Sequence, residues 1–183
     1  HLWMLGWLAK QGHLRLRQIT ELDLRDIGLI EFPPIIKYLR KLRKVRLEKN
    51  PIYSLWESIE EVSIDHKQIH RFAWICKKMQ NPPEFNIDFS DYMGDETIIW
   101  SSLDDLPNIV SITFSNPSVT ELPDWLRSIK TLRSLKLSGS CIQSLPPWIC
   151  ELDNLETLKL GNQSKDLDFV LPENISELPA LHH

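Results

Sequence analysis

The sequence predicts an α/β solenoid, in which a curved parallel sheet forms the concave side and short helical or irregular segments return along the convex side. Two observations predict this fold. A pattern of apolar residues recurs at a near-constant spacing along most of the chain, and each copy opens with alternating apolar and polar residues. A fixed period of this length is typical of solenoids, and the alternation is typical of a strand with one buried face.

The repeat is clearest in two adjacent segments, 109–131 (IVSITFSNPSVTELPDWLRSIKT) and 132–154 (LRSLKLSGSCIQSLPPWICELDN). In each segment apolar residues fall at positions 1, 4, 6, 11, 14, 18 and 21, and proline falls at position 15. The same frame yields five further repeats, which span 19–41, 42–58, 59–81, 82–108 and 155–180. We therefore expect seven repeats over residues 19–180, the second shortened and the fourth and seventh lengthened.

The two ends of the array are expected to differ from its middle. Residues 1–18 carry Leu2, Leu5 and Leu8 at helical spacing, so they are interpreted as a capping segment over the first coil. A membrane-surface helix is the alternative, but the segment lacks the basic face of such helices. Residues 181–183 are interpreted as the end of the array or the remnant of a tag.

Each repeat is expected to contribute one strand centred on position 4. The predicted centres are Leu22, Val45, Val62, Phe85, Ile112, Leu135 and Leu158. On the return side, proline disfavours long helices, so short helical or 3₁₀ turns are expected. Between His66 and His70 the frame predicts strand and turn, so these two histidines are not expected to form a metal site.

The repeat resembles the leucine-rich repeat, whose pattern is LxxLxLxxNxLxxLPxxIxxLxx. Within that family the chain is similar to bacterial repeats of the leptospiral type, and residues 145–160 (LPPWICELDNLETLKL) also resemble the cytoplasmic repeats of plant immune receptors. The family's asparagine at position 9 is kept only as Asn50. In the family this side chain forms hydrogen bonds with the backbone of the neighbouring turn. Its absence from the other repeats therefore implies looser packing between coils, with water or serine forming these hydrogen bonds instead.

Composition narrows the classes of function. The chain is 42% apolar and 25% charged, with a net charge of −4, which argues against a nucleic-acid partner. No apolar run is long enough to span a bilayer. Cys76, Cys141 and Cys150 are too few for a disulfide scaffold, and none lies in a recognisable catalytic triad. We expect a non-catalytic monomer without a cofactor.

The exposed face of the sheet is predicted to carry an acidic patch. Positions 3, 5 and 7 point outward, and equal positions of successive repeats lie about 4.8 Å apart. Glu61 should then face Glu84, and position 7 should form a file of carboxylates. The candidate partner-binding residues are Glu48, Glu61, Asp65, Glu84, Asn86 and Asp88. Opposed like charges destabilise a sheet, so a basic protein partner or a cation would relieve them. A solvated face screened by salt is the alternative.

The lengthened fourth repeat adds further carboxylates beside this patch, namely Asp91, Asp95, Glu96, Asp104 and Asp105. Asp88, Ser90 and Asp91 have the oxygen-rich spacing of a calcium loop but lack the glycine turn and closing glutamate of an EF-hand. Calcium is therefore the one cation that we consider for this segment, and we assign no residue as a metal ligand.

The resemblance implies two functions. The leptospiral likeness implies a secreted or cell-surface protein that attaches to host cell-surface or matrix proteins during infection. The likeness to plant receptors implies the repeat portion of a cytoplasmic immune-type receptor or signalling scaffold. Trp125 and Trp148 share position 17 and should line up on the convex side, where they either cover the edge of the core or form a patch for a partner.

Overall fold

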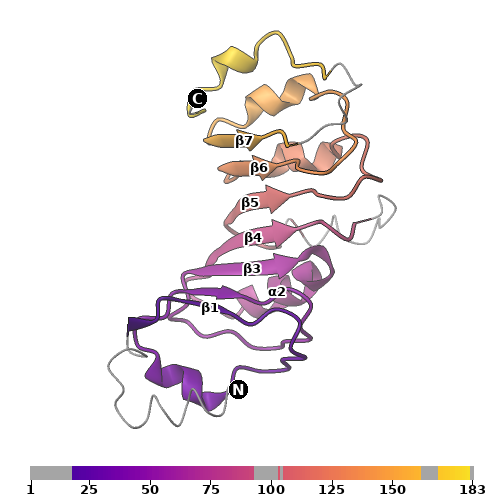
Figure 1. Ribbon diagram of the computed structural model, residues 1–183. Coiled ribbons are helices and arrows are strands. Elements are labelled where there is room, and N and C mark those ends of the chain that lie inside the picture. The colour runs from indigo at the N-terminus through magenta and orange to yellow at the C-terminus, as the bar shows by residue number, and fades with distance from the viewer. Residues whose placement is uncertain (1–17, 93–102, 104, 162–168, 182–183) are drawn as a thin grey trace.

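A computed structural model of the chain describes residues 18–92, 103, 105–161 and 169–181. Within these residues the strands pair in chain order into one parallel sheet (Figure 1). The strands are β1 (Glu21–Asp23), β2 (Lys44–Arg46), β3 (Glu61–Asp65), β4 (Glu84–Asp88), β5 (Ile109–Thr113), β6 (Ser134–Lys136) and β7 (Thr157–Lys159). The open sheet with one strand per repeat confirms the predicted solenoid, whose curvature stays a prediction. Each predicted centre lies within its strand.

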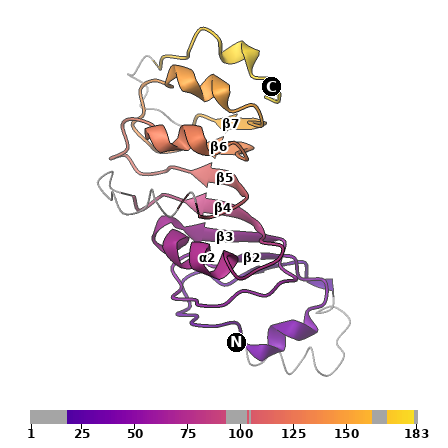
Figure 2. The same ribbon diagram turned by 180° about the vertical axis from the view of Figure 1, so that it is seen from behind.

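Helical segments return the chain on the opposite side of the sheet (Figure 2). Most are 3₁₀ turns: η2 (Pro34–Tyr38), η3 (His66–Gln68), η4 (Asp124–Ser128), η5 (Pro147–Glu151) and η6 (Ile175–Glu177). Pro33, Pro123 and Pro146 occupy the N-cap of η2, η4 and η5 in extended conformation. Proline thus precedes each of these three turns, and the predicted short 3₁₀ turns are present.

The third repeat is the exception, and the prediction of strand and turn between His66 and His70 was wrong. There η3 leads directly into an α-helix, α2 (Ile69–Cys76). The repeat 59–81 contains no proline, so nothing interrupts the helical hydrogen bonds. Ile69, Phe72 and Ile75 are among the residues that form one buried face of α2, and this face anchors the helix on the core.

The core lies between the sheet and the returning segments. Val45, Val62, Phe85, Ile112 and Leu135 point inward from consecutive strands and are at most 1% exposed. The end positions Leu22 and Leu158 are only partly buried, because each has a neighbouring strand on one side. Removing such continuous apolar surface from water supplies most of the stability of a solenoid.

Aromatic rings fill the middle of this core. The ring of Phe89 lies 4.9 Å from Phe114 and 5.5 Å from Trp125, measured between centroids. Trp125 and Trp148 are both partly buried and packed against the core. These contacts favour the interpretation that the two tryptophans cover the edge of the core.

Asn50 holds the second coil to the first. Its Oδ1 accepts hydrogen bonds from the amides of Ile27 (3.2 Å) and Leu29 (2.8 Å), and its Nδ2 donates to the Leu24 carbonyl (2.7 Å). The next coil uses Gln68, whose Nε2 donates to the carbonyls of Leu47 (2.9 Å) and Asn50 (2.7 Å). Gln68 therefore joins the third coil to the second by hydrogen bonds, although the repeat pattern has no conserved polar residue at its position.

Ser140 occupies the asparagine position in a later coil, and its hydrogen bond stays within that coil. The Ser140 hydroxyl donates to the Leu137 carbonyl at 3.0 Å, and Ser140 is buried. Some predictions concern residues that lie outside the described part of the chain: most of the capping segment, the two terminal histidines, and Asp95, Glu96 and Asp104. Within the described part, no helix has the length and apolar character needed to cross a membrane.

Candidate binding site on the strand face

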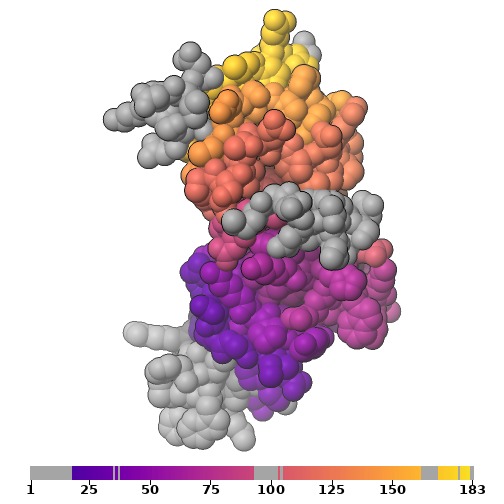
Figure 3. Space-filling view, turned by 90° about the vertical axis from the view of Figure 1, so that its right-hand side faces the viewer, coloured from indigo at the N-terminus to yellow at the C-terminus, as the bar shows by residue number. Residues whose placement is uncertain are grey.

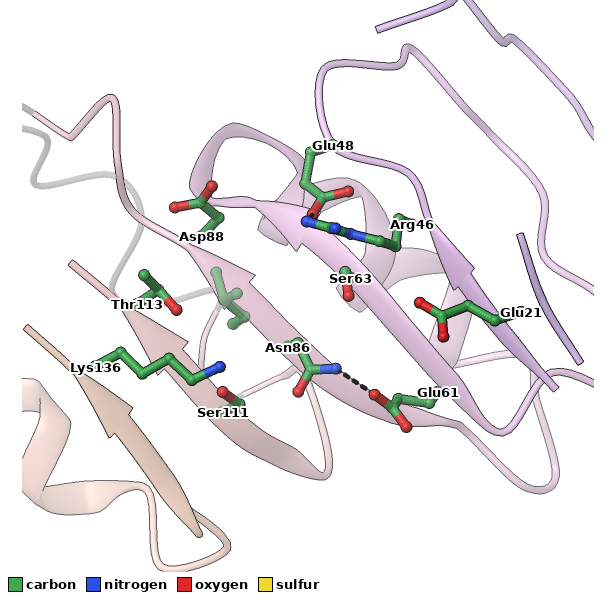
Figure 4. A pocket seen from close by; sticks show the side chains of 11 residues that line it. Glu21, Arg46, Glu48, Glu61, Ser63, Asn86, Asp88, Ser111, Thr113 and Lys136 are labelled. Atoms are coloured by element: carbon green, nitrogen blue, oxygen red, sulfur yellow. Dashed lines mark hydrogen bonds and ion pairs between the residues drawn. The ribbon is translucent and has the colours of Figure 1, made fainter. Parts of the chain in front are cut away.

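The outward side of the sheet carries a shallow depression of about 480 Å³ that extends over six strands (Figure 4). We call it the strand-face depression. It is lined by Glu21, Arg46, Glu48, Glu61, Ser63, Asn86, Ile87, Asp88, Ser111, Thr113 and Lys136. The space-filling view shows that the coils keep their chain order along the molecule (Figure 3), so this lining combines side chains from consecutive repeats.

The structure brings four of the six predicted binding residues into this depression, which are Glu48, Glu61, Asn86 and Asp88. Asp65 instead lines a neighbouring depression of about 380 Å³, together with Lys49 and Arg71. Glu84 lines neither of these two. The predicted site is therefore one continuous stretch of sheet, but its members face two adjacent hollows.

The predicted opposition of like charges is present between β3 and β4. Glu61 pairs in register with Glu84, and Asp65 pairs with Asp88. Residues opposite each other in neighbouring strands lie close enough for their charges to interact, and two carboxylates in these positions repel. The middle of the sheet thus holds two such pairs at opposite ends of the same strands.

Local cations partly neutralise the first pair. Lys44 forms an ion pair with Glu61, and this hydrogen-bonded contact raises the pKa of the lysine. Asn86 donates from Nδ2 to Glu61 Oε1 at 2.8 Å, and Arg133 lies 3.3 Å from Glu84. A binding partner would therefore have to compete with Lys44 and Arg133 at this end of the strands.

Glu48, the first member of the predicted file of carboxylates, lies on the strand face but is covered rather than exposed. Glu48 is only 6% exposed, and its Oε1 lies 3.2 Å from the Arg46 guanidinium. Among the described residues, Glu48 Oε2 is buried without a hydrogen-bond donor. The next residue, Lys49, adopts a left-handed φ of 62°. Glu48 still lines the strand-face depression, where it lies against Arg46 and is covered from solvent.

Asp65 and Asp88 use part of their hydrogen-bonding capacity to hold loops. Asp65 Oδ2 accepts from the Lys49 amide at 2.6 Å, and Asp88 Oδ1 accepts from the Ser90 amide at 2.8 Å. The Ser90 hydroxyl also donates to Asp88. These carboxylates therefore fix the turns that leave the sheet as well as contributing negative charge.

The same contacts bear on the calcium hypothesis. Asp91 lies 3.4 Å from the Lys49 amine, and Asp88 already accepts from Ser90. The described residues contain no cluster of three or more His, Cys, Asp or Glu side chains that could hold a metal ion. Calcium at this site therefore has no arranged ligand set in the part of the chain that the structure describes.

The strand register changes between β4 and β5, which the repeat frame did not predict. The frame places Phe85 opposite Ile112, but the ladder pairs Phe85 with Ile109 and Ile87 with Ile112. The irregularity lies between Phe85 and Asn86, where β5 contains the extra residue Val110. Beyond this bulge, each residue of β4 pairs with a β5 residue whose position number in the repeat is two lower than its own. For example, Ile87 at position 6 pairs with Ile112 at position 4.

Because of this shift, Lys136 lies in line with Asp65 and Asp88 across the strands. Asp88 pairs with Thr113, and Thr113 pairs with Lys136. The amine of Lys136 points from β6 toward the middle of the depression (Figure 4). Sequence reasoning did not include Lys136 or Arg46 in the site. A signal was present, since Phe89 aligns with Phe114 once Ile87 is aligned with Ile112.

The chain was compared with known proteins. No family model and no curated protein matches it. It is similar to a solved leucine-rich repeat protein of Leptospira interrogans at 20% identity and a TM-score of 0.42, over 94% of this chain and 38% of that protein. It is also similar to the leucine-rich repeat domain of the type III effector XopL at 22% identity and a TM-score of 0.33, over 85% of this chain and 49% of that structure.

Both of these structural neighbours are leucine-rich repeat proteins, and this chain spans less than half the length of each. The assignment of a leucine-rich-repeat fold to this chain rests on its own features. These are the seven in-frame repeats, the parallel sheet in chain order and the asparagine bonds of Asn50.

Proposed function

We propose that the chain is a non-catalytic protein-interaction module that binds a basic protein segment on its strand face. The observation that supports this most directly is the opposition of Glu61 to Glu84 and of Asp65 to Asp88 in adjacent strands. Each pair costs a few tenths to about 1 kcal/mol when no cation lies between the carboxylates. A lysine or arginine from a partner would turn this repulsion into attraction.

The rest of the depression suggests how such a partner would be oriented. Its acidic side is formed by Glu61 and Asp88, and the opposite side carries Lys136. Between them lie the uncharged side chains of Asn86 and Ser111, which can donate and accept hydrogen bonds. A segment with basic residues at one end and neutral or acidic residues at the other would fit this charge distribution best.

The wider biological setting is proposed from the sequence resemblance. We infer a bacterial secreted or cell-surface protein that attaches to host cell-surface or matrix proteins. The alternative is the repeat portion of an immune-type receptor or signalling scaffold in the cytoplasm. The full-length gene distinguishes them, because a signal peptide upstream supports the first and a nucleotide-binding domain upstream supports the second.

A titration with a defined probe tests the binding proposal. A fluorescein-labelled peptide of alternating Lys and Ser is titrated with the wild type, with Asp65→Asn/Asp88→Asn, and with Glu121→Gln/Asp153→Asn. The last variant removes the same charge from exposed positions outside the strand face. The proposal predicts that only the first double variant weakens binding, roughly threefold or more, and that added salt weakens wild-type binding.

The same titration is repeated with calcium and with a chelator. Equal affinity of the wild type and both double variants at low salt would contradict the proposal, since the strand face would then be a solvated surface only. Binding that requires calcium and disappears with the chelator would also contradict it, because a metal ion rather than a basic segment would then be the link.

A further inference from the structure

The α2 helix and the residues beside it present a surface that differs in charge from the strand face, and the two surfaces meet where Lys67 and Arg71 line one depression with Asp65. The segment 66–83 contains no Asp or Glu, although the chain has 25 acidic residues in total. Four permanently charged residues lie in it: Lys67, Arg71, Lys77 and Lys78. Two helical turns of purely basic character in a chain of net charge −4 form a local surface of opposite sign to the strand face.

Arg71 lies in α2, Lys67 precedes the helix in η3, and Lys77 and Lys78 follow it, so their spacing places the four cations along one side of α2. The buried face of the helix includes Ile69, Phe72 and Ile75. The residues between them in the helical projection point away from the core. Together they form what we call the α2 outer face, which consists of Lys67, His70, Arg71, Trp74, Lys77 and Lys78.

Two exposed aromatic rings accompany the basic residues. Trp74 is 53% exposed, and the Lys78 amine lies 3.6 Å from the centroid of its ring. Tyr53, in the preceding coil, is 56% exposed, and the Arg71 guanidinium lies 4.4 Å from its ring centroid. Each ring is thus held under a cation while much of its surface stays open, whereas Trp125 and Trp148 are packed against the core.

Carboxylates of the described residues offset part of the positive charge on this face, since Asp65 and Asp91 line one depression with Lys67 and Arg71. Lys77 pairs with Asp105 at 2.7 Å, while Lys78 and Arg71 contact aromatic rings. A cation placed over a ring keeps its charge and several of its donors available. Tryptophan, tyrosine and arginine are also the residue types most enriched at the centres of protein interfaces.

We propose that the α2 outer face is a second interaction surface, which binds an acidic protein segment. The partner's carboxylates would contact Lys67, Arg71 and Lys78, and its apolar side chains would pack on Trp74. A membrane surface is a poorer fit, because the apolar face of α2 is buried in the core and Trp74 is the one large hydrophobic side chain that α2 leaves exposed. A nucleic acid is disfavoured by the net negative charge of the chain.

The proposal is tested with a fluorescein-labelled peptide of alternating Glu and Ser that ends in Leu. The test variant is Lys67→Gln/Arg71→Gln/Lys78→Gln. The matched control is Arg40→Gln/Lys130→Gln/Lys159→Gln, which removes the same charge from exposed positions elsewhere. We expect the test variant to weaken binding about fivefold or more, because several exposed ion pairs each contribute modestly. The control should bind like the wild type.

Two further measurements separate this surface from the alternatives. Trp74→Ala, which changes an exposed side chain, should weaken peptide binding without lowering the unfolding temperature. Glu61→Gln/Glu84→Gln changes two strand-face residues outside the depression that Asp65 shares with Lys67 and Arg71. It should leave binding of the acidic peptide intact, so failure of the strand-face proposal would not affect this one. Equal binding by the test and control variants would overturn the proposal. So would binding to phosphatidylserine vesicles or duplex DNA with none to the peptide.

Discussion

Asp65 of β3 lies directly opposite Asp88 of β4, and each of these carboxylates also accepts a backbone amide from a loop that leaves the sheet. The two aspartates therefore have a structural role as hydrogen-bond acceptors and an electrostatic effect as a repelling pair. Substitutions that change one property at a time can separate the two contributions.

Asp65→Asn/Asp88→Asn should leave the free energy of unfolding unchanged or raise it by up to about 1 kcal/mol. Asparagine keeps an oxygen that can accept from the Lys49 and Ser90 amides, while the repulsion across the strands is removed. Asp65→Ala/Asp88→Ala loses the acceptors as well and should cost about 1–3 kcal/mol. Denaturant titration gives both values, and a marked loss of stability in the asparagine variant would contradict the repulsion between the pair.

Leu135→Ala should destabilise the fold by about 2–5 kcal/mol, because the side chain is fully buried and leaves a cavity. Leu160→Ala provides the matched control. Leu160 is 37% exposed one coil further along, so its truncation should cost under about 1 kcal/mol. Chemical denaturation measures the two changes, and similar losses at both positions would mean that the core is misplaced.

Asn50→Ala should cost about 2–4 kcal/mol, since buried amides and carbonyls of the first two coils lose their partners. Asn154→Ala is the control. Asn154 is exposed and donates a single hydrogen bond to the Lys130 carbonyl at 2.8 Å, so about 1 kcal/mol or less is expected. Equal effects in thermal unfolding would show that the asparagine bonds do not hold the stack.

Cys76 should make stability depend on pH at the alkaline end. Burial raises the pKa of its thiol from 9.0 to about 11. Between these values the unfolded chain loses the thiol proton while the folded chain keeps it, so the folded state loses stability as pH rises from about 9 to 11. Cys76→Ala should reduce this slope, by on the order of 1 kcal/mol over the window. An unchanged slope would contradict the raised pKa.

The strands and their centres were predictable because alternation of apolar and polar residues marks one buried face locally. Val62 and Leu135 are clear in any single repeat, and the period then orders the strands. The short turns after Pro123 and Pro146 were predictable for the same reason, since proline restricts its own coil. These features depend on residues close together in sequence.

The missed features depend on contacts between coils. The β4–β5 ladder is offset from the repeat frame by three residues at Phe85 and by two beyond the bulge at Val110, and the length of the fourth repeat alone does not give this offset. Glu48 is buried on the strand face, where its carboxylate lies 3.2 Å from the Arg46 guanidinium. Gln68 is not at the family's asparagine position, yet its side chain reaches back to the Leu47 carbonyl. A pattern of single positions does not contain this information.

Mapping the Lys–Ser peptide onto the protein by amide chemical shifts tests the central claim most directly. The spectrum of the labelled chain is recorded with and without peptide at low salt. Binding on the strand face predicts that the largest shifts are at Ser63, Asn86 and Ser111, and that they decrease in Asp65→Asn/Asp88→Asn. Shifts centred on α2, or on η4 and η5 behind the sheet, would contradict the account.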